Sequence, residues 1–174
     1  MRFASGYISD DKYNLQIGVA KSTKAGSSVS GDSSLHIKLD DGKYLLALSD
    51  GKGSGPEAMK SSKIAIKMLE RLLTAGFDKD VSIKLINSTL AANTDEDMFA
   101  TLDIEILDLF NGNMEYIKSS ACPTYVKRGR NVQLLKEFSL PAGILDDMGL
   151  TVYDYDLQDG DILVMCTDGV IDSN

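Results

Sequence analysis

The sequence has no tryptophan and only three prolines, two cysteines and one histidine among its 174 residues. Protein zinc sites are usually built from four Cys and His ligands, so the single His36 and the widely separated Cys122 and Cys166 argue against zinc. A Ser-His-Asp mechanism would have to use His36, which lies between two apolar residues of an expected strand and is interpreted as solvated. The two cysteines suit a reducing compartment and are expected to pack as small hydrophobes.

Long hydrophobic runs are also missing. No run approaches the ~20 apolar residues that a membrane helix needs, and the first residues lack the apolar core of a signal peptide. The chain is therefore expected to be cytoplasmic. Basic residues are in deficit, with 18 Lys and Arg against 26 Asp and Glu and a formal net charge of −8. Because nucleic-acid binding depends on clusters of Lys and Arg, this charge argues against a DNA or RNA partner.

What the sequence does contain is a clear order of elements within a length that fits one domain. Helical spacing from Pro56 to Gly76 and from Lys79 to Ala92 predicts two consecutive helices. The apolar run Tyr44–Ser49 predicts a strand that is buried on both faces. Strands on either side of a helix pair, without βαβ alternation, predict an α+β fold in which two antiparallel sheets stack as a sandwich. The expected strands are Leu15–Ala20, Leu35–Leu39, Tyr44–Ser49, Leu102–Leu107, Met114–Lys118, Thr124–Lys127, Val132–Lys136, Leu150–Leu157 and Asp161–Thr167.

An aspartate adjoins a glycine at a strand end or just before a strand in three places. These are Ser30-Gly31-Asp32, Ser49-Asp50-Gly51 and Thr167-Asp168-Gly169. Glycine lets the backbone turn sharply and can bring a main-chain carbonyl close to the ion that the carboxylate binds. Hard cations such as Mg²⁺ and Mn²⁺ take oxygen ligands, and a pair of them can promote displacement at phosphorus. The pattern predicts a divalent-cation site, whereas the Asp-Gly pairs at 41–42 and 159–160 are interpreted as ordinary turns.

Two other motifs invite different chemistry. The segment Asp50–Glu57 is glycine-rich and opens a helix, but it lacks the Walker spacing and the third glycine of a dinucleotide-binding loop. The segment Cys122–Arg128 has the Cys-x5-Arg spacing of thiol-based phosphatases. Its intervening residues are Pro, aromatic and β-branched, so they predict a strand rather than a phosphate-cradling loop. The first motif is therefore not interpreted as a nucleotide site, and the spacing of the second is interpreted as coincidental.

Seven segments together resemble the bacterial branch of the type 2C, metal-dependent serine/threonine phosphatases, and within it most closely the phosphatase domain of the stage II sporulation protein E family. The resemblance runs from about Gly18 to the end of the chain. The segments are Ser30–Ser33, Leu48–Ala58, Ile83–Ser88, Ala100–Asp103, Pro123–Gly129, Leu140–Ile144 and Thr167–Gly169.

The resemblance implies a specific fold and a specific site. The fold would be an α-β-β-α sandwich of two antiparallel sheets flanked by helix pairs. Asp50 would bridge two Mn²⁺ or Mg²⁺ ions, the Gly51 carbonyl would bind one of them, and Asp168 would ligate the second. Asp32 would hold metal-bound water or contact a metal directly. A phosphoserine would be hydrolysed in one step, and the helices at about 56–92 would form a regulatory switch.

The resemblance also implies partners and a larger context. The substrate would be a phosphorylated anti-sigma factor antagonist, whose dephosphorylation releases a sporulation sigma factor; a homo-oligomer is left open. The family's domain continues beyond the Thr-Asp-Gly segment with helices and a final strand that carries another metal-binding aspartate. Residues 1–174 are therefore expected to be a partial phosphatase domain that binds metal weakly, and a parent protein could be membrane-anchored. The alternative function is a non-catalytic regulatory or protein-interaction module on the same fold.

Overall fold

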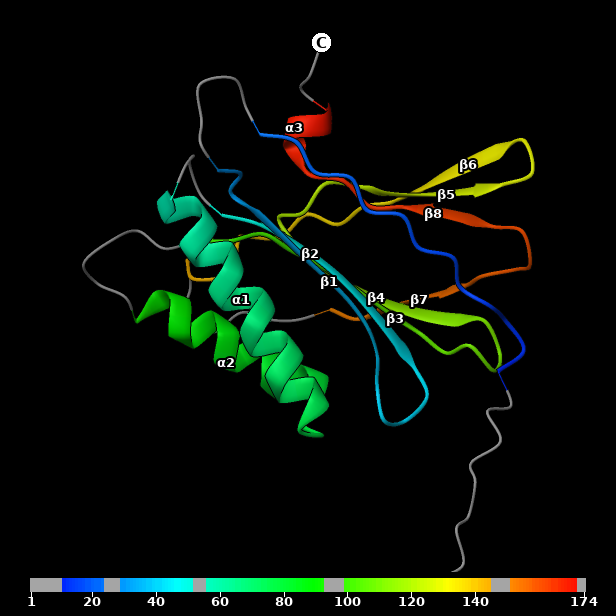
Figure 1. Ribbon diagram of the computed structural model, residues 1–174, viewed down its shortest axis with the longest axis horizontal. Helices are drawn as coiled ribbons and strands as arrows, with labels where there is room; N and C mark the ends of the chain where they lie inside the picture. The colour runs from blue at the N-terminus through cyan, green and yellow to red at the C-terminus, as the bar shows by residue number, and fades with distance from the viewer. Residues whose placement is uncertain (1–10, 24–28, 52–55, 93–98, 145–150, 172–174) are drawn as a thin grey trace, which may run out of the picture.

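Two antiparallel sheets and a pair of helices form three layers in the computed structural model, which describes residues 11–23, 29–51, 56–92, 99–144 and 151–171 (Figure 1). The larger sheet has the order β1-β2-β3-β4-β7 and the smaller one β6-β5-β8. Helices α1 and α2 cover one face of the larger sheet, and the smaller sheet lies on its other side (Figure 1). The strands are β1 (Asp32–Lys38), β2 (Tyr44–Asp50), β3 (Leu102–Leu107), β4 (Asn113–Ser119), β5 (Thr124–Arg128), β6 (Asn131–Leu135), β7 (Tyr153–Asp156) and β8 (Ile162–Val164).

The helix pair follows its sequence signals closely. Helix α1 spans Pro56–Thr74 and begins at the predicted proline, while Gly76 ends it with a positive φ of 82°. Helix α2 spans Lys79–Ala91, and its first turn is capped by Asp78, whose side chain accepts a hydrogen bond from the Asp80 N–H. A short helix, α3, spans Asp168–Ile171. In the described part of the chain, no helix is long and apolar enough to cross a membrane.

Two hydrophobic clusters hold the layers together. The first lies between the helices and the larger sheet, where Leu69 of α1 and Ile86 of α2 meet Leu45 and Ile104. The second lies between the two sheets, around Met114 and Val126. Strand β3 runs between both clusters, and all six of its residues are buried. The predicted α+β fold with two stacked antiparallel sheets is confirmed, and α1 and α2 form its one described helical layer.

Three strand predictions need correction. The segment Leu15–Ala20 is not a strand but crosses the molecule as an unpaired extended segment. Strand β2 alternates between buried and half-buried residues, so it is not buried on both faces. Strand β8 is limited to three residues, Ile162–Val164, although Asp161–Thr167 was expected. All three differences have one reason, because a strand forms and becomes covered only where another strand or layer is present, and sequence alternation does not reveal this. The predicted first residue of Leu150–Leu157 lies outside the described residues.

Candidate metal centre

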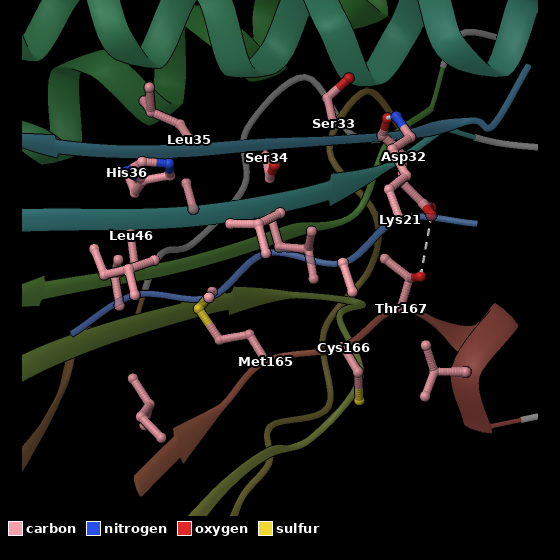
Figure 2. Close-up of a pocket in the computed structure, with 18 of the residues that line it drawn as sticks. Lys21, Asp32, Ser33, Ser34, Leu35, His36, Leu46, Met165, Cys166 and Thr167 are labelled. Carbon is pink, nitrogen blue, oxygen red and sulfur yellow. Dashed lines mark hydrogen bonds between the residues drawn. The ribbon is translucent and has the colours of Figure 1, made fainter. Parts of the chain in front are cut away.

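Asp32 and Asp50 face one another at one end of the larger sheet. Asp32 begins β1, Asp50 ends β2, and the two are direct partners in the antiparallel register. Directly opposite residues have Cβ atoms about 4.5–5.5 Å apart, so two carboxylates lie side by side here. Figure 2 shows Ser33 and Leu35 of β1 pointing toward the helices, whereas Ser34 and His36 point to the opposite side. Asp32 shares the side of Ser34, which faces the smaller sheet.

The third aspartate approaches this pair from the far end of the chain. The Thr167 hydroxyl donates a hydrogen bond of 3.3 Å to Asp32 Oδ2, although the two residues are 135 positions apart (Figure 2). The Ser30 hydroxyl donates to the same carboxylate oxygen at 3.0 Å. Asp168 directly follows Thr167 and is close enough to Asp50 to raise its pKa. The three aspartates predicted as ligands are thus brought to one place.

The backbone of Asp50 is tied to its neighbours on both sides. Its N–H donates to the Thr101 hydroxyl at 2.9 Å, and the Thr101 N–H donates back to the Asp50 carbonyl at 2.8 Å. The N–H of Gly51 donates to the Gly31 carbonyl at 3.4 Å. The Gly31 carbonyl also accepts a hydrogen bond from the Ser62 hydroxyl of α1. Thr101 and Ser62 were not predicted as site residues, and only the position of Thr101 within a family segment could have signalled its role.

Electrostatics make Asp50 the centre of the group. The pKa of Asp50 is raised from 3.8 to about 7. Burial is the largest cause of this shift, and the charges of Asp32 and Asp168 come next. Hydrogen bonding between the protonated Asp50 carboxyl and the other two carboxylates raises the pKa further. Three acidic groups in one half-buried place cannot all ionise without cost. A divalent cation is the ligand that would relieve this repulsion.

The two glycines beside the aspartates leave room for oxygen atoms and for a helix. A Cβ on Gly31 would lie 3.2 Å from Asp50 Oδ1 and 3.6 Å from the Gly51 carbonyl oxygen, so these two oxygens converge on the glycine turn. A Cβ on Gly51 would lie 1.8 Å from the Ala58 carbonyl oxygen of α1, which no side chain can tolerate. The first turns of α1 therefore pack directly on the backbone that presents the Gly51 carbonyl.

The donor set fits a hard cation. It consists of three carboxylates and a main-chain carbonyl, which are the ligands that Mg²⁺ and Mn²⁺ prefer. Among the described residues, no three or more His, Cys, Asp or Glu side chains already lie close enough together to hold a metal ion. Open spacing is expected for carboxylates that repel one another, because the charge of an ion is what draws such ligands together.

The structure argues against thiol chemistry at Cys122 and places His36 in solvent. Thr124–Arg128 of the Cys-x5-Arg motif forms strand β5, and Arg128 makes an ion pair of 2.7 Å with Asp161. Burial raises the pKa of Cys122 to about 11, which keeps its thiol protonated and unreactive. His36 is exposed on β1, as predicted. Positions 52–55 of the glycine-rich loop lie outside the described residues.

A large cavity adjoins the aspartates on the side away from the helices. Its volume is about 1690 Å³, and it runs along β1 and β2 beneath the segment that contains Leu15 and Ile17. Lys21 lies at its rim and donates a hydrogen bond to the Asp32 carbonyl (Figure 2). Met165 and Cys166 also line this cavity and lie away from β1 (Figure 2). Nothing in the local sequence around Lys21 indicated that it would reach the site.

Comparison with known proteins identifies the family. The family model described as stage II sporulation protein E (SpoIIE) matches residues 40–174, which is most of the chain. The chain belongs to the SpoIIE family. Its sequence is 37% identical to the stage II sporulation protein E of Bacillus subtilis over 164 residues, which are 94% of this chain and 20% of that protein. It is also 37% identical to the same protein of Priestia megaterium over 160 residues, 92% of this chain and 27% of the relative.

Solved structures of a SpoIIE-family protein and of RsbX share the fold. The Bacillus subtilis structure of the PP2C phosphatase domain with a fragment of the regulatory domain has a TM-score of 0.79 and 37% identity, covering 88% of this chain and 45% of that one. The structure of RsbX in complex with magnesium has a TM-score of 0.70 at 21% identity, covering 84% and 70%, and shows likeness of fold alone. This SpoIIE-family chain spans about a fifth to a quarter of the length of its curated relatives.

Proposed function

We propose that this chain is the catalytic part of a metal-dependent phosphoprotein phosphatase. Asp32, Asp50 and Asp168 would be its catalytic metal ligands, and the Gly51 carbonyl a further ligand. The observation that carries the proposal is the meeting of three carboxylates, from three separate segments, around the half-buried Asp50. Membership of the SpoIIE family supports it, because the related Bacillus subtilis structure is described as a PP2C phosphatase domain. Mn²⁺ or Mg²⁺ is the expected cofactor, since all donors are oxygen atoms.

The residues of the site divide the work between them. Bound divalent cations supply charge neutralisation and activation of a water for in-line displacement at phosphorus. Asp50 gives up its proton when a cation binds, because an adjacent positive charge lowers a carboxyl pKa. Thr101, which directly precedes β3, pairs with both the N–H and the carbonyl of Asp50 and so fixes the backbone from which the carboxylate projects. Ser30 and Thr167 orient the Asp32 carboxylate by hydrogen bonds to its Oδ2.

An assay of the purified chain with 4-nitrophenyl phosphate and a phosphoserine peptide tests this proposal. Hydrolysis is expected to require Mn²⁺ or Mg²⁺, to stop in excess EDTA, and to be abolished by Asp50→Asn. The matched control is Asp41→Asn, which alters an Asp-Gly aspartate of the β1–β2 turn at the opposite end of the hairpin. Activity that survives EDTA, or that Asp50→Asn leaves intact, would contradict the metal mechanism.

We further propose that the physiological substrate is a phosphoserine on an anti-sigma factor antagonist, and that its dephosphorylation controls a sporulation sigma factor. The support is membership of a sporulation family. The test is phosphate release from a purified phosphorylated antagonist, with a phosphoserine peptide of unrelated sequence as the reference. Preference for the antagonist by kcat/KM is the expected result, and equal rates would refute the assignment.

The competing function, a non-catalytic interaction module on the same fold, gives a different result in a metal titration. A working site is expected to bind Mn²⁺ in isothermal titration calorimetry, and Asp50→Asn is expected to abolish the signal. A vestigial site would give no heat of binding in either protein. The convergence of the aspartates favours the catalytic proposal, because an unused site has no reason to keep three repelling carboxylates together.

A further inference from the structure

A cluster of charged side chains lies buried between the two sheets, directly behind the aspartate site. Asp103 and Glu105 project from β3, Lys118 from β4 and Thr124 from β5, and none is more than 5% exposed. Asp103 and Lys118 are register partners, and their carboxylate and ammonium groups form an ion pair whose side chains are 2% and 0% exposed. Burying an ion pair costs free energy of desolvation that an apolar pair of similar volume would not. The core alone therefore gives no reason for these charges.

The hydrogen bonds of the cluster centre on the Thr124 hydroxyl. Burial, and then the Asp103 charge, raise the pKa of Glu105 well above its usual value, which favours its neutral form. The Thr124 hydroxyl accepts from Lys118 at 2.8 Å and lies within donating distance of a carboxylate oxygen of Asp103, at 3.1 Å, and of Glu105, at 2.9 Å. The opposite charges of Asp103 and Lys118 balance one another, which reduces the cost of burying the pair.

The third donor of Lys118 reaches outside the cluster. Its Nζ donates to the Cys122 carbonyl at 3.0 Å, so all three ammonium protons are used, by Asp103, Thr124 and Cys122. The Cys122 carbonyl belongs to the turn Ser120–Cys122 between β4 and β5. Ser120 has a positive φ of 51°, which is unfavourable for a residue with a side chain. Such a conformation persists only where surrounding contacts hold it. The Ser139 hydroxyl, which accepts from the Ser120 N–H at 3.1 Å, supplies one such contact, and Lys118 supplies another at Cys122.

This turn and the aspartate site line the same small cavity. The cavity has a volume of about 60 Å³. Its lining includes Ser120, Cys122 and Asp103 together with Asp50 and Asp168. A shift of the turn would therefore change the space into which the two carboxylates project.

We propose that Lys118, held by Asp103, is a positioning residue that fixes the Ser120–Cys122 turn behind Asp50 and Asp168 and thereby sets their separation for a divalent cation. The role in metal binding rests on the proposed function, whereas the role in fixing the turn does not. The pair acts through the turn and touches neither substrate nor cation. Groups that orient ligands in this way typically change metal affinity by about 10- to 100-fold when they are lost.

The decisive variant is the double substitution Asp103→Leu with Lys118→Met. It removes both charges together, so no unpaired charge stays buried, and thermal unfolding measured by circular dichroism is expected to match the parent protein. In calorimetry its affinity for Mn²⁺ is expected to fall about tenfold or more. The matched control is Glu105→Gln, which keeps a neutral group in the same cluster but makes no contact with the turn. It is expected to bind Mn²⁺ like the parent.

A second readout follows the turn without any metal. In a Cys166→Ala background, Cys122 is the one remaining cysteine, and its rate of labelling by Ellman's reagent in EDTA reports exposure of the turn. Labelling is expected to be at least about fivefold faster in the double variant and unchanged in Glu105→Gln, because only the double variant releases the Cys122 carbonyl. If the double variant does not fold, Asp103→Asn with Lys118→Gln replaces it, since both side chains keep their approximate volume and polarity and neither leaves a buried charge.

The outcomes separate the two proposals. Faster labelling together with weaker Mn²⁺ binding supports the positioning role. Unchanged labelling in the folded double variant, or in the variant Asp103→Asn with Lys118→Gln, overturns it whatever happens to the metal. Faster labelling with unchanged Mn²⁺ affinity also overturns it, because the turn would then not set the carboxylates. If the parent chain itself binds no Mn²⁺, the proposed function fails, and the labelling result still decides whether Lys118 fixes the turn.

Discussion

Replacement of Asp50 by asparagine is expected to stabilise the metal-free protein at pH 8 while abolishing metal binding. The reason is that Asp50 is ionised at this pH beside two other carboxylates, whereas asparagine is neutral and nearly isosteric. The folded state raises the pKa of Asp50 from 3.8 to about 7. The folded protein thus binds the proton more tightly than the unfolded chain, so the free energy of unfolding of the wild type falls as pH rises between these values.

The magnitude follows from the pKa difference. About three pH units correspond to roughly 4 kcal/mol at full strength. Asp50 is only half-buried, and solvent screening reduces this to about 1–2 kcal/mol. The difference in unfolding free energy between Asp50→Asn and wild type should therefore be near zero at pH 4 and reach about 1–2 kcal/mol in favour of the variant at pH 8.

Urea unfolding in EDTA at pH 4, 6 and 8 measures this difference. Asp161→Asn is the control of opposite sign. Its hydrogen bonds from Arg128 lower the pKa of Asp161, so the wild-type carboxylate stabilises the protein above its usual pKa and loses that effect in acid. Asp161→Asn should be destabilising at pH 8 and neutral at low pH. If Asp50→Asn is no more stable than wild type at pH 8, the three carboxylates do not repel one another and the reasoning fails.

Three further predictions concern the packing around the site. Gly51→Ala is expected to lower the free energy of unfolding by ~3 kcal/mol or more in urea titration, because its Cβ would overlap the Ala58 carbonyl, and near-native stability would refute this close approach. Gly31→Ala should lower the free energy of unfolding by only about 1 kcal/mol. It should weaken Mn²⁺ binding about tenfold in calorimetry, because its Cβ would press on Asp50 Oδ1. Unchanged Mn²⁺ affinity would show that the space between Gly31 and Asp50 does not matter for binding. Leu69→Ala, at a fully buried position of α1, should lower the free energy of unfolding by about 2–5 kcal/mol in the same urea assay and leave the Mn²⁺ affinity unchanged. A loss of Mn²⁺ affinity would mean that the packing of the core and the geometry of the site are not separable.

Local chemistry allowed much of the fold to be predicted. The turn around Gly42 and the turn at Asn111-Gly112 both have the positive φ that glycine permits, and Pro56 marks the start of α1. What local chemistry could not supply is the number of layers that cover a strand. The alternation of Leu102 and Ile104 with Asp103 predicts a strand with one polar face, but both faces of β3 are buried.

The same limit applies to the site. The Asp-Gly pattern selected Asp32, Asp50 and Asp168 as candidates, and the apolar runs before Asp50 and Asp168 placed those two at the rim of a core. In the structure Asp32 and Asp50 do lie at strand ends, whereas Asp168 begins the short helix α3. It could not show that Lys118 would balance a buried Asp103, since this pairing depends on the register of β3 with β4. Nor could it show that Thr101 would hold the Asp50 backbone across 51 positions of sequence. Contacts set by register become visible only when the sheet is assembled.

The register between β1 and β2 has a consequence for the order in which the site forms. The two strands are joined by a tight turn, so Asp32 and Asp50 meet within one local hairpin, whereas Thr167 joins them from 135 residues further along the chain. Hairpins form in about 1–10 μs, and contacts of high sequence separation come later. Two carboxylates are then opposed before the rest of the site exists to orient them. Dissolved divalent cations could act on this chain during folding as a counterion that lets its first hairpin close.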